Sequence, residues 1–89
     1  MVERDVPIIN KLGLHARAAA KFVTLASSYS CDVQLARNQR AVNGKSIMGV
    51  MMLAAAKGST VKIIVNGVDE LEALDSLAEL VNNRFGESE

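Results

Sequence analysis

The sequence predicts an α+β fold, a two-layer open-faced sandwich. Segments in which apolar and polar residues alternate predict strands, and segments in which apolar residues recur at helical spacing predict helices. In chain order these segments give βαββαβα, which is typical of three helices packed on one face of a four-stranded antiparallel sheet. The chain contains no repeats, linkers or low-complexity segments, so residues 1–89 are expected to form a single domain.

The first part of the chain predicts a strand and a helix. Apolar and polar residues alternate over residues 2–8, and Pro7 favours a position at the edge or the end of that strand. After a loop around Gly13, a helix is expected from about Ala16 to Ser28, and its high Ala content implies close packing against another element. The apolar side of this helix is expected to contain Ala16, Ala19, Ala20, Val23 and Ala26.

Three further strands are expected. Residues 31–35 alternate as a strand that begins with Cys31, which is best interpreted as a small buried residue. A polar turn over residues 37–40 joins this strand to a short one at residues 41–42, so the two form a hairpin. The last strand covers residues 61–65 and stops at an Asn-Gly pair.

The last element is the clearest predicted helix. Asp69 stands where an N-cap residue is expected, and Gly86 closes the segment. Acidic residues crowd its N-terminal half, which the helix dipole favours. Its apolar stripe is formed by Leu71, Leu74, Leu77, Ala78 and Val81.

A short helix that Ser46 opens and Gly58 ends is apolar on more than one side. Val50, Leu53 and Ala54 are expected to face the core. The residues on its other side would have little left to bury them in a chain of this size, so they predict an exposed apolar patch. Methionine suits a surface that adapts to several partners, although it also fills gaps in cores. The predicted patch consists of Ile47, Met48 and Met51.

Composition limits the class of protein. A chain of 89 residues, 49% hydrophobic and 22% charged, forms one globular core. Ten basic and ten acidic residues cancel and only three residues are aromatic, which argues against nucleic-acid binding. The single cysteine excludes an internal disulfide. The N-terminus lacks the apolar core of a signal peptide, and no apolar stretch approaches the roughly 20 residues that cross a bilayer, so a cytoplasmic protein is expected.

The only histidine, His15, lies where the loop enters the first predicted helix. The first N–H groups of a helix lack intrahelical acceptors and carry partial positive charge, and a Ser, Thr, Asp or Asn usually caps them. A single histidine in a small domain is more commonly a solvated or satisfied polar residue. Here, however, its ring nitrogen is a nucleophile at neutral pH, and the open amides of Ala16 and Arg17 favour a bound phosphoryl group.

Arg17 places a cation in the first helical turn, where the helix dipole disfavours it by about 0.3–1 kcal/mol. An exposed Arg is ordinarily just solvated, yet this position becomes favourable when an anion binds, and a planar guanidinium suits phosphate oxygens. No metal site is expected, because one His and one Cys supply too few ligands. No cofactor is expected either, because the chain has no Gly-rich nucleotide loop, and it lacks the paired groups of an enzyme active site.

Two segments of the chain resemble the HPr family, the histidine phosphocarrier proteins of the bacterial phosphoenolpyruvate-dependent phosphotransferase system. The first segment is Lys11-Leu12-Gly13-Leu14-His15-Ala16-Arg17. The second is Asn43-Gly44-Lys45-Ser46-Ile47-Met48-Gly49-Val50-Met51. The resemblance covers nearly the whole chain, and two motifs at the right spacing are far more specific than either one.

This resemblance implies a carrier protein that is not itself an enzyme. His15 would accept a phosphoryl group from phosphorylated enzyme I, on the ring nitrogen nearer the backbone, and pass it to an enzyme IIA-type protein, with Arg17 as the phosphate partner. Ser46 occupies the position that an HPr kinase/phosphorylase modifies in some bacteria. A transient carrier of this kind is expected to be a monomer. The family's docking surface combines the first two helices, which here present Ala20, Ile47, Met48 and Met51.

One position departs from the resemblance, because many HPr proteins carry Pro where this chain has Ala18. Pro is favoured early in a helix because it fixes φ, so we expect a slightly less rigid site and a divergent branch of the family. Two alternative functions stay open. One is a regulatory protein-interaction module of a nitrogen-type or incomplete phosphotransferase system, acting through the apolar patch and Ser46. The other is a small domain that binds a free anion at the helix start.

Overall fold

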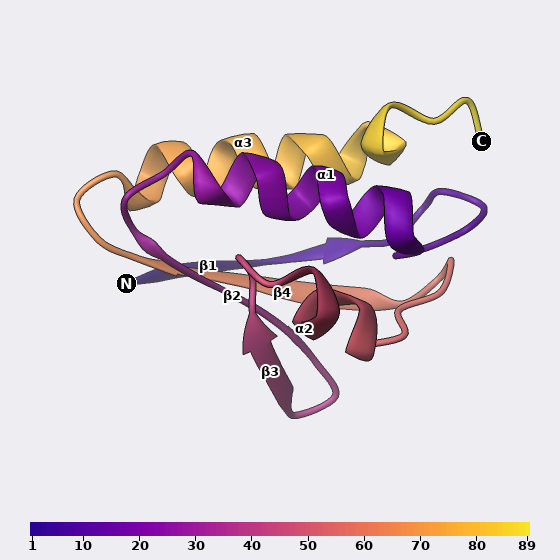
Figure 1. Ribbon diagram of the computed structural model, residues 1–89, viewed down its shortest axis with the longest axis horizontal. Coiled ribbons are helices and arrows are strands. Elements are labelled where there is room, and N and C mark those ends of the chain that lie inside the picture. The colour runs from indigo at the N-terminus through magenta and orange to yellow at the C-terminus, as the bar shows by residue number, and fades with distance from the viewer.

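A computed structural model describes residues 1–89 and confirms the βαββαβα order (Figure 1). The chain forms strands β1 (Val2–Pro7), β2 (Asp32–Arg37), β3 (Arg40–Asn43) and β4 (Thr60–Asn66). Its helices are α1 (Ala16–Ser27), α2 (Ile47–Met52) and α3 (Glu70–Asn82), followed by a 3-10 turn, η1 (Arg84–Gly86). No helix is long and apolar enough to span a bilayer.

The four strands form one antiparallel sheet in the order β1-β4-β2-β3. Pro7 is the last residue of edge strand β1, where it lies opposite Thr60. Such a position suits proline, because it has no N–H to donate to a neighbouring strand. Strands β2 and β3 are joined by a two-residue turn at Asn38 and Gln39, whose φ angles of 51° and 70° match the sense of twist in a tight hairpin.

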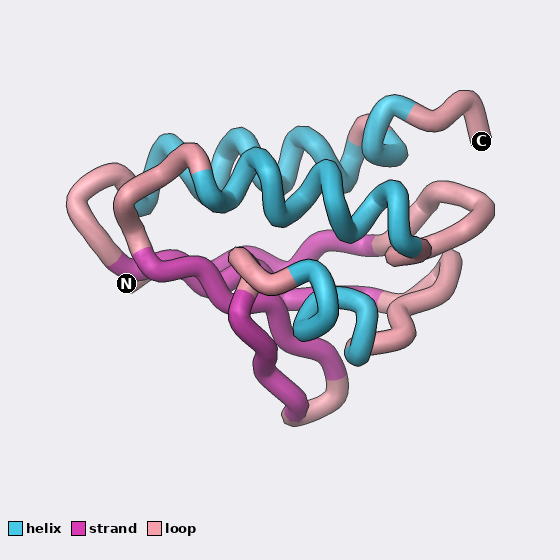
Figure 2. The backbone as a smooth tube through the Cα atoms, in the orientation of Figure 1, coloured by secondary structure: helices cyan, strands magenta, loops and turns pink.

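All three helices pack on one face of the sheet, with α1 and α3 side by side above the strands (Figure 2). The apolar residues of β2 and β4 that point to this face are buried, as the alternating pattern predicts. Helix α1 contacts both other helices. The largest fully buried side chains of the core are Phe22, Phe85, Ile8, Leu35, Ile63 and Leu77.

The buried side of α1 differs from the predicted one. Ala19, Val23 and Ala26 are buried as expected, but Ala16 is exposed and Ala20 only half-buried. The row that contains Phe22 takes their place in the core, because a large aromatic side chain buries far more apolar area than an alanine.

Helix α2 is shorter than the sequence predicted. Ser46 caps it and Val50 and Leu53 are buried, as expected. The helix ends at Met52, however, and Ala54 turns outward with a φ of 50° instead of facing the core. The residues that follow form no regular structure, and the carbonyl of Ala55 accepts a hydrogen bond from the N–H of Leu14 in the loop before α1. Gly58 therefore belongs to the α2–β4 connection and does not end the helix.

Helix α3 corrects two other expectations. Leu71 is 67% exposed, because no other element covers the first turn of the helix on that side. Asp69 precedes the helix but makes no side-chain cap. Its carboxylate instead accepts hydrogen bonds from the backbone N–H groups of Ser30 and Cys31, at 2.8 and 2.9 Å. Cys31 is buried as expected, and this burial, with the Asp69 carboxylate beside it, raises the pKa of its thiol.

Candidate functional site

The loop that carries His15 is fixed on both sides. Gly13 has a φ of 65°, and a Cβ atom there would lie 2.5 Å from the carbonyl oxygen of Ala55. The next residue, Leu14, donates a backbone hydrogen bond of 2.9 Å to that same oxygen. On the other side, the side chain of fully buried Asn10 donates to the carbonyl of Gly13 at 2.9 Å. Glycine is therefore strongly favoured here, and hydrogen bonds on both sides hold the loop that enters α1.

His15 stands at the N-cap of α1 with extended backbone angles, φ −73° and ψ 177°. Its carbonyl accepts the first helical hydrogen bond, from the N–H of Ala19 at 2.9 Å. Its imidazole makes no capping bond, and no carboxylate lies in the first turn. The N–H groups of Ala16 and Arg17 therefore have no acceptor within the chain, and free N–H groups at a helix start are donors that an anion can use.

The imidazole of His15 is partly exposed and is hydrogen-bonded to another side chain. Its side chain is 25% exposed, and its Nε2 atom is hydrogen-bonded to Oε2 of Glu87 near the C-terminus. No hydrogen bond reaches Nδ1, the ring nitrogen nearer the backbone. The ring is therefore held at one nitrogen and unoccupied at the other.

Glu87 is a site residue that the sequence reasoning missed. The side chain of Asn10 donates to its Oε1 at 2.9 Å, so both oxygens of the carboxylate have partners within the site. Burial, the largest single influence, raises the pKa of Glu87. The hydrogen bonds from Asn10 and His15, with the nearby charges of His15 and Lys21, together outweigh burial and lower that pKa. The carboxylate is therefore ionised at neutral pH.

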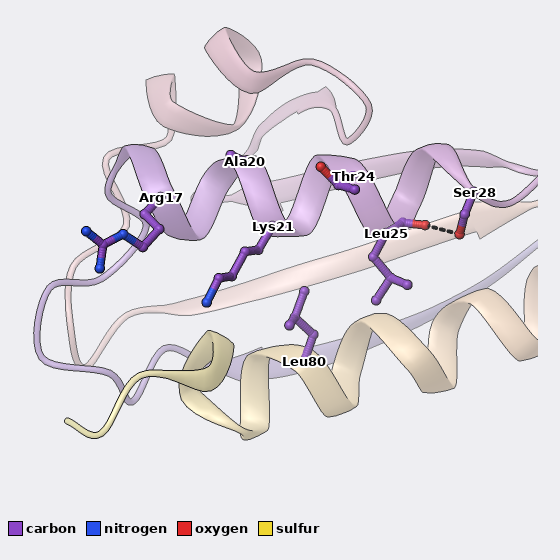
Figure 3. A pocket seen from close by; sticks show the side chains of 7 residues that line it. All are labelled: Arg17, Ala20, Lys21, Thr24, Leu25, Ser28 and Leu80. Carbon is purple, nitrogen blue, oxygen red and sulfur yellow. Dashed lines mark hydrogen bonds between the residues drawn. The ribbon is translucent and has the colours of Figure 1, made fainter.

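Arg17 is exposed and forms no hydrogen bond or ion pair with another protein residue. It stands at one end of an open groove of about 560 Å³ between α1 and α3, in which Leu25 and Leu80 point toward one another (Figure 3). Ala20 also lines this groove. The guanidinium is therefore available to an anion, and it borders an apolar surface.

The predicted patch on α2 is exposed. Ile47, Met48 and Met51 are 44%, 75% and 41% accessible, and the adjoining Met52 is exposed as well. The alternative, in which these methionines fill gaps in the core, is therefore wrong. At the start of the same helix, the Oγ of Ser46 accepts a hydrogen bond of 3.1 Å from the N–H of Gly49. Helix α1, which begins beside His15, packs against α2, so the two helices that carry these residues are neighbours in the fold.

Comparison with known proteins identifies the family. A family model described as "PTS HPr component phosphorylation site" matches residues 2–83. The chain belongs to the HPr family. The phosphocarrier protein HPr of Cupriavidus necator is 58% identical over 89 residues, which cover 100% of both chains. The crystal structure of HPr-C-His from Thermoanaerobacter tengcongensis has a TM-score of 0.96 at 44% identity and covers 100% of each chain. An HPr dimer from the same organism has a TM-score of 0.78 at 45% identity, covering 98% of this chain and 100% of its own.

The chain is thus an HPr-type phosphocarrier of the phosphotransferase system. It offers one unoccupied ring nitrogen, two backbone donors without acceptors and one unpaired guanidinium. Ala18, where many HPr proteins carry Pro, is fully buried and continues α1 without a break. The replacement of the usual Pro by Ala18 therefore leaves the start of α1 unchanged.

Proposed function

We propose that the chain accepts a phosphoryl group from phosphorylated enzyme I on Nδ1 of His15 and passes it to an enzyme IIA-type protein. The single observation that supports this most strongly is the imidazole itself, which is bonded at Nε2 and unoccupied at Nδ1 beside open amides. Family membership supplies the partners. Because the phosphoryl group comes from phosphoenolpyruvate, the exchange would take place in the cytoplasm.

In the proposed step, the lone pair of Nδ1 forms a bond to phosphorus. The bond between phosphorus and the donor's own nucleophile breaks, and its electron pair returns to that nucleophile. The N–H groups of Ala16 and Arg17 and the guanidinium of Arg17 would contact the equatorial oxygens, where charge accumulates. The reverse sequence of bond changes then moves the group to the next carrier.

The docking surface in this proposal consists of Ala20, Ile47, Met48 and Met51. These side chains lie on the neighbouring helices α1 and α2, and three of them are exposed apolar residues. Exposed apolar patches of this kind commonly mark protein–protein contacts. A shallow, open surface also suits a protein partner better than a small molecule, which would require enclosure.

Ser46 would be a regulatory phosphorylation site for an HPr kinase/phosphorylase. Its hydroxyl caps α2 at the border of the exposed patch. A phosphate there would add about two negative charges next to Ile47, which must be desolvated when a partner docks. Phosphorylation of Ser46 is thus expected to weaken the docking of enzyme I while leaving the fold intact.

The test is phosphorylation of the purified chain with enzyme I and radiolabelled phosphoenolpyruvate. We expect an acid-labile phosphate on the unsubstituted chain and on Ser46→Ala, and none on His15→Ala. Label that survives in His15→Ala, or no label on the folded unsubstituted chain, would contradict the carrier function. Label on none of the three, combined with equal partner binding by all, would instead support the regulatory module.

We also propose that the working form is a monomer, since a carrier must present the same face to successive partners. The surface formed by α1 and α2 is exposed in the single chain. Light scattering across a hundredfold range of concentration is expected to give the mass of one chain throughout. A mass that doubles within that range would contradict this.

A further inference from the structure

We propose that Glu87 is a positioning residue for phosphoryl transfer, which keeps a proton on Nε2 of His15 and thereby keeps Nδ1 as the nucleophile. This inference rests on the proposed carrier function and adds a residue to it. It starts from the hydrogen bond between Nε2 and the Glu87 carboxylate, which joins residues 72 positions apart in the sequence.

The chain around Glu87 has an unusual conformation that directs this residue to the site. Arg84, Phe85 and Gly86 have successive φ angles of 55°, 54° and 80°. The first two are not glycines, so their left-handed conformation is strained, and such strain persists only where the surroundings impose it. Here the side chain of Phe85 is fully buried in the core. The turn therefore anchors the chain two residues before Glu87.

Two further contacts hold the segment on either side of Glu87. The Nζ of Lys21, on α1, donates a hydrogen bond of 2.7 Å to the carbonyl of Phe85. The backbone N–H of Lys11, in the loop before His15, donates to the carbonyl of Glu89. In Figure 1 this yellow C-terminal segment runs beside the indigo loop that precedes α1. Several contacts therefore hold the C-terminal segment in place, and the hydrogen bond between Glu87 and His15 is one of them.

Asn10 connects the carboxylate to the loop of the site. Its Nδ2 group donates one hydrogen bond to the carbonyl of Gly13 and another to Oε1 of Glu87, each 2.9 Å long. Asn10 is completely buried, so its amide cannot rotate without losing both bonds. The carboxylate is therefore oriented by Asn10 at one oxygen, and its other oxygen faces His15.

This orientation determines which ring nitrogen reacts. An ionised carboxylate can only accept hydrogen bonds, so Nε2 must carry the proton that joins the two groups. In a neutral imidazole the other nitrogen, Nδ1, then holds the lone pair. Without the carboxylate, both tautomers would be populated, and the fraction with a proton on Nδ1 could not attack phosphorus.

The same proton helps in both directions of transfer. When Nδ1 bonds to phosphorus, the ring becomes an imidazolium, and the Glu87 carboxylate stabilises its charge at Nε2. When the group leaves, the Nδ1–P bond breaks and its electron pair returns to Nδ1, so the ring departs as neutral imidazole with Nε2 still protonated. A neutral imidazole is a better leaving group than an imidazolate. Other charged groups around the site are Lys11, Arg17, Lys21 and Glu89.

The first experiment measures the tautomer directly in the unphosphorylated chain. Long-range proton–nitrogen NMR correlations of the ring of His15 are expected to report a proton on Nε2 and none on Nδ1 at pH 8. In Glu87→Gln, which keeps the size of the side chain but removes its charge, we expect a mixture of the two tautomers. Glu89→Gln is the matched control, because it removes one charge from the same segment while its backbone contact with Lys11 stays. An unchanged tautomer in Glu87→Gln would overturn the proposal.

The second experiment measures the initial rate of phosphorylation by enzyme I. Carboxylates that orient a metal-bound histidine through its second nitrogen contribute roughly 10–100-fold to affinity or activity. By the same orienting effect, we expect Glu87→Gln to be phosphorylated about tenfold more slowly and Glu89→Gln at the original rate. The pH profile for hydrolysis of the phosphorylated chain is expected to shift to lower pH in Glu87→Gln only. Equal rates and equal profiles for both variants would overturn the proposal.

These two measurements separate the proposal from the function on which it rests. If the unsubstituted chain is not phosphorylated at all, the carrier function fails, while the tautomer of His15 is still defined by the NMR measurement. If the chain is phosphorylated and Glu87→Gln matches it in rate and tautomer, only the role of Glu87 fails. Thermal unfolding of each variant confirms that a loss of rate does not come from a loss of fold.

Discussion

At the scale of single residues, Gly13 is the position that most clearly ties the backbone to the site. A substitution to Ala there adds a Cβ that would lie 2.5 Å from the Ala55 oxygen, in a backbone region that disfavours any side chain. We expect Gly13→Ala to lose about 2–4 kcal/mol of unfolding free energy, from the left-handed backbone and the displaced loop together. Urea unfolding followed by circular dichroism measures this loss.

Gly58 provides the matched control for that substitution. It also has a positive φ, 94°, but a Cβ there would meet no atom within 4 Å. Gly58→Ala should therefore lose only the backbone contribution, about 1–2 kcal/mol, and should be phosphorylated at the original rate. If the two variants unfold at the same urea concentration, the close approach of Gly13 to the α2–β4 loop is unimportant for stability.

The positions of His15, Arg17 and Ser46 at helix starts could be predicted from the sequence, because residue type and local pattern together indicate where a helix begins. Glu87 could not be predicted in this way. Its contact with His15 depends on a left-handed turn at two non-glycine residues, a conformation that local propensities disfavour. The only signal was Gly86, because glycine commonly ends a helix. The prediction that it closes the last helix was wrong, since α3 ends at Asn82 and Gly86 belongs to the 3-10 turn that follows.

At the scale of elements, the short helix α2 depends on its cap. The Oγ of Ser46 accepts from the N–H of Gly49, and the helix has a single buried residue, Val50, to hold it to the core. We expect Ser46→Ala to lose about 1 kcal/mol of unfolding free energy. Ser27→Ala, at an exposed position of α1 whose side chain makes no hydrogen bond, should change it by less than about 0.5 kcal/mol. Equal urea midpoints for the two variants would show that the cap is not needed.

The existence and order of the elements followed from periodicity, whereas their buried sides and ends depended on neighbours. The alanine-rich pattern of α1 fits several stripes almost equally well, and the choice between Ala16 and Phe22 is made by packing against the sheet and the other helices. Likewise, the end of α2 is set by Arg37, whose Nη1 donates to the carbonyl of Leu53 at 3.0 Å, and by the hydrogen bond that Ala55 accepts. Such long-range contacts are not visible in a local pattern.

At the scale of the whole molecule, two adjacent carboxylates at the start of α3 contact segments that are distant in sequence. Asp69 accepts from the N–H of Ser30, which is the main cause of its lowered pKa, and also from Cys31. The N–H of Gly67 lowers the pKa of Glu70, which also pairs with the N-terminus. For each of these groups the folded pKa lies below the unfolded value, so the unfolded state binds more protons in acid. Their contribution is fully present above about pH 5 and is lost as pH falls through the folded pKa.

Because the pKa of Asp69 is lowered by folding, acid is expected to destabilise the protein through this residue in particular. Its two hydrogen bonds, from the N–H groups of Ser30 and Cys31, fix the α1–β2 connection to the start of α3. Asp69→Asn should be less stable at pH 7, since an amide presents an NH₂ group where the carboxylate accepted a hydrogen bond. Its loss of stability between pH 7 and pH 3 should be smaller than that of the unsubstituted chain, because the group that titrates is gone. Asp32→Asn, at an exposed aspartate that forms no ion pair or hydrogen bond through its side chain, should keep the original pH dependence. The measurement is the urea midpoint of each variant at pH 7 and at pH 3. If Asp69→Asn loses as much stability between these pH values as Asp32→Asn does, the connection to α3 does not depend on the charge of Asp69.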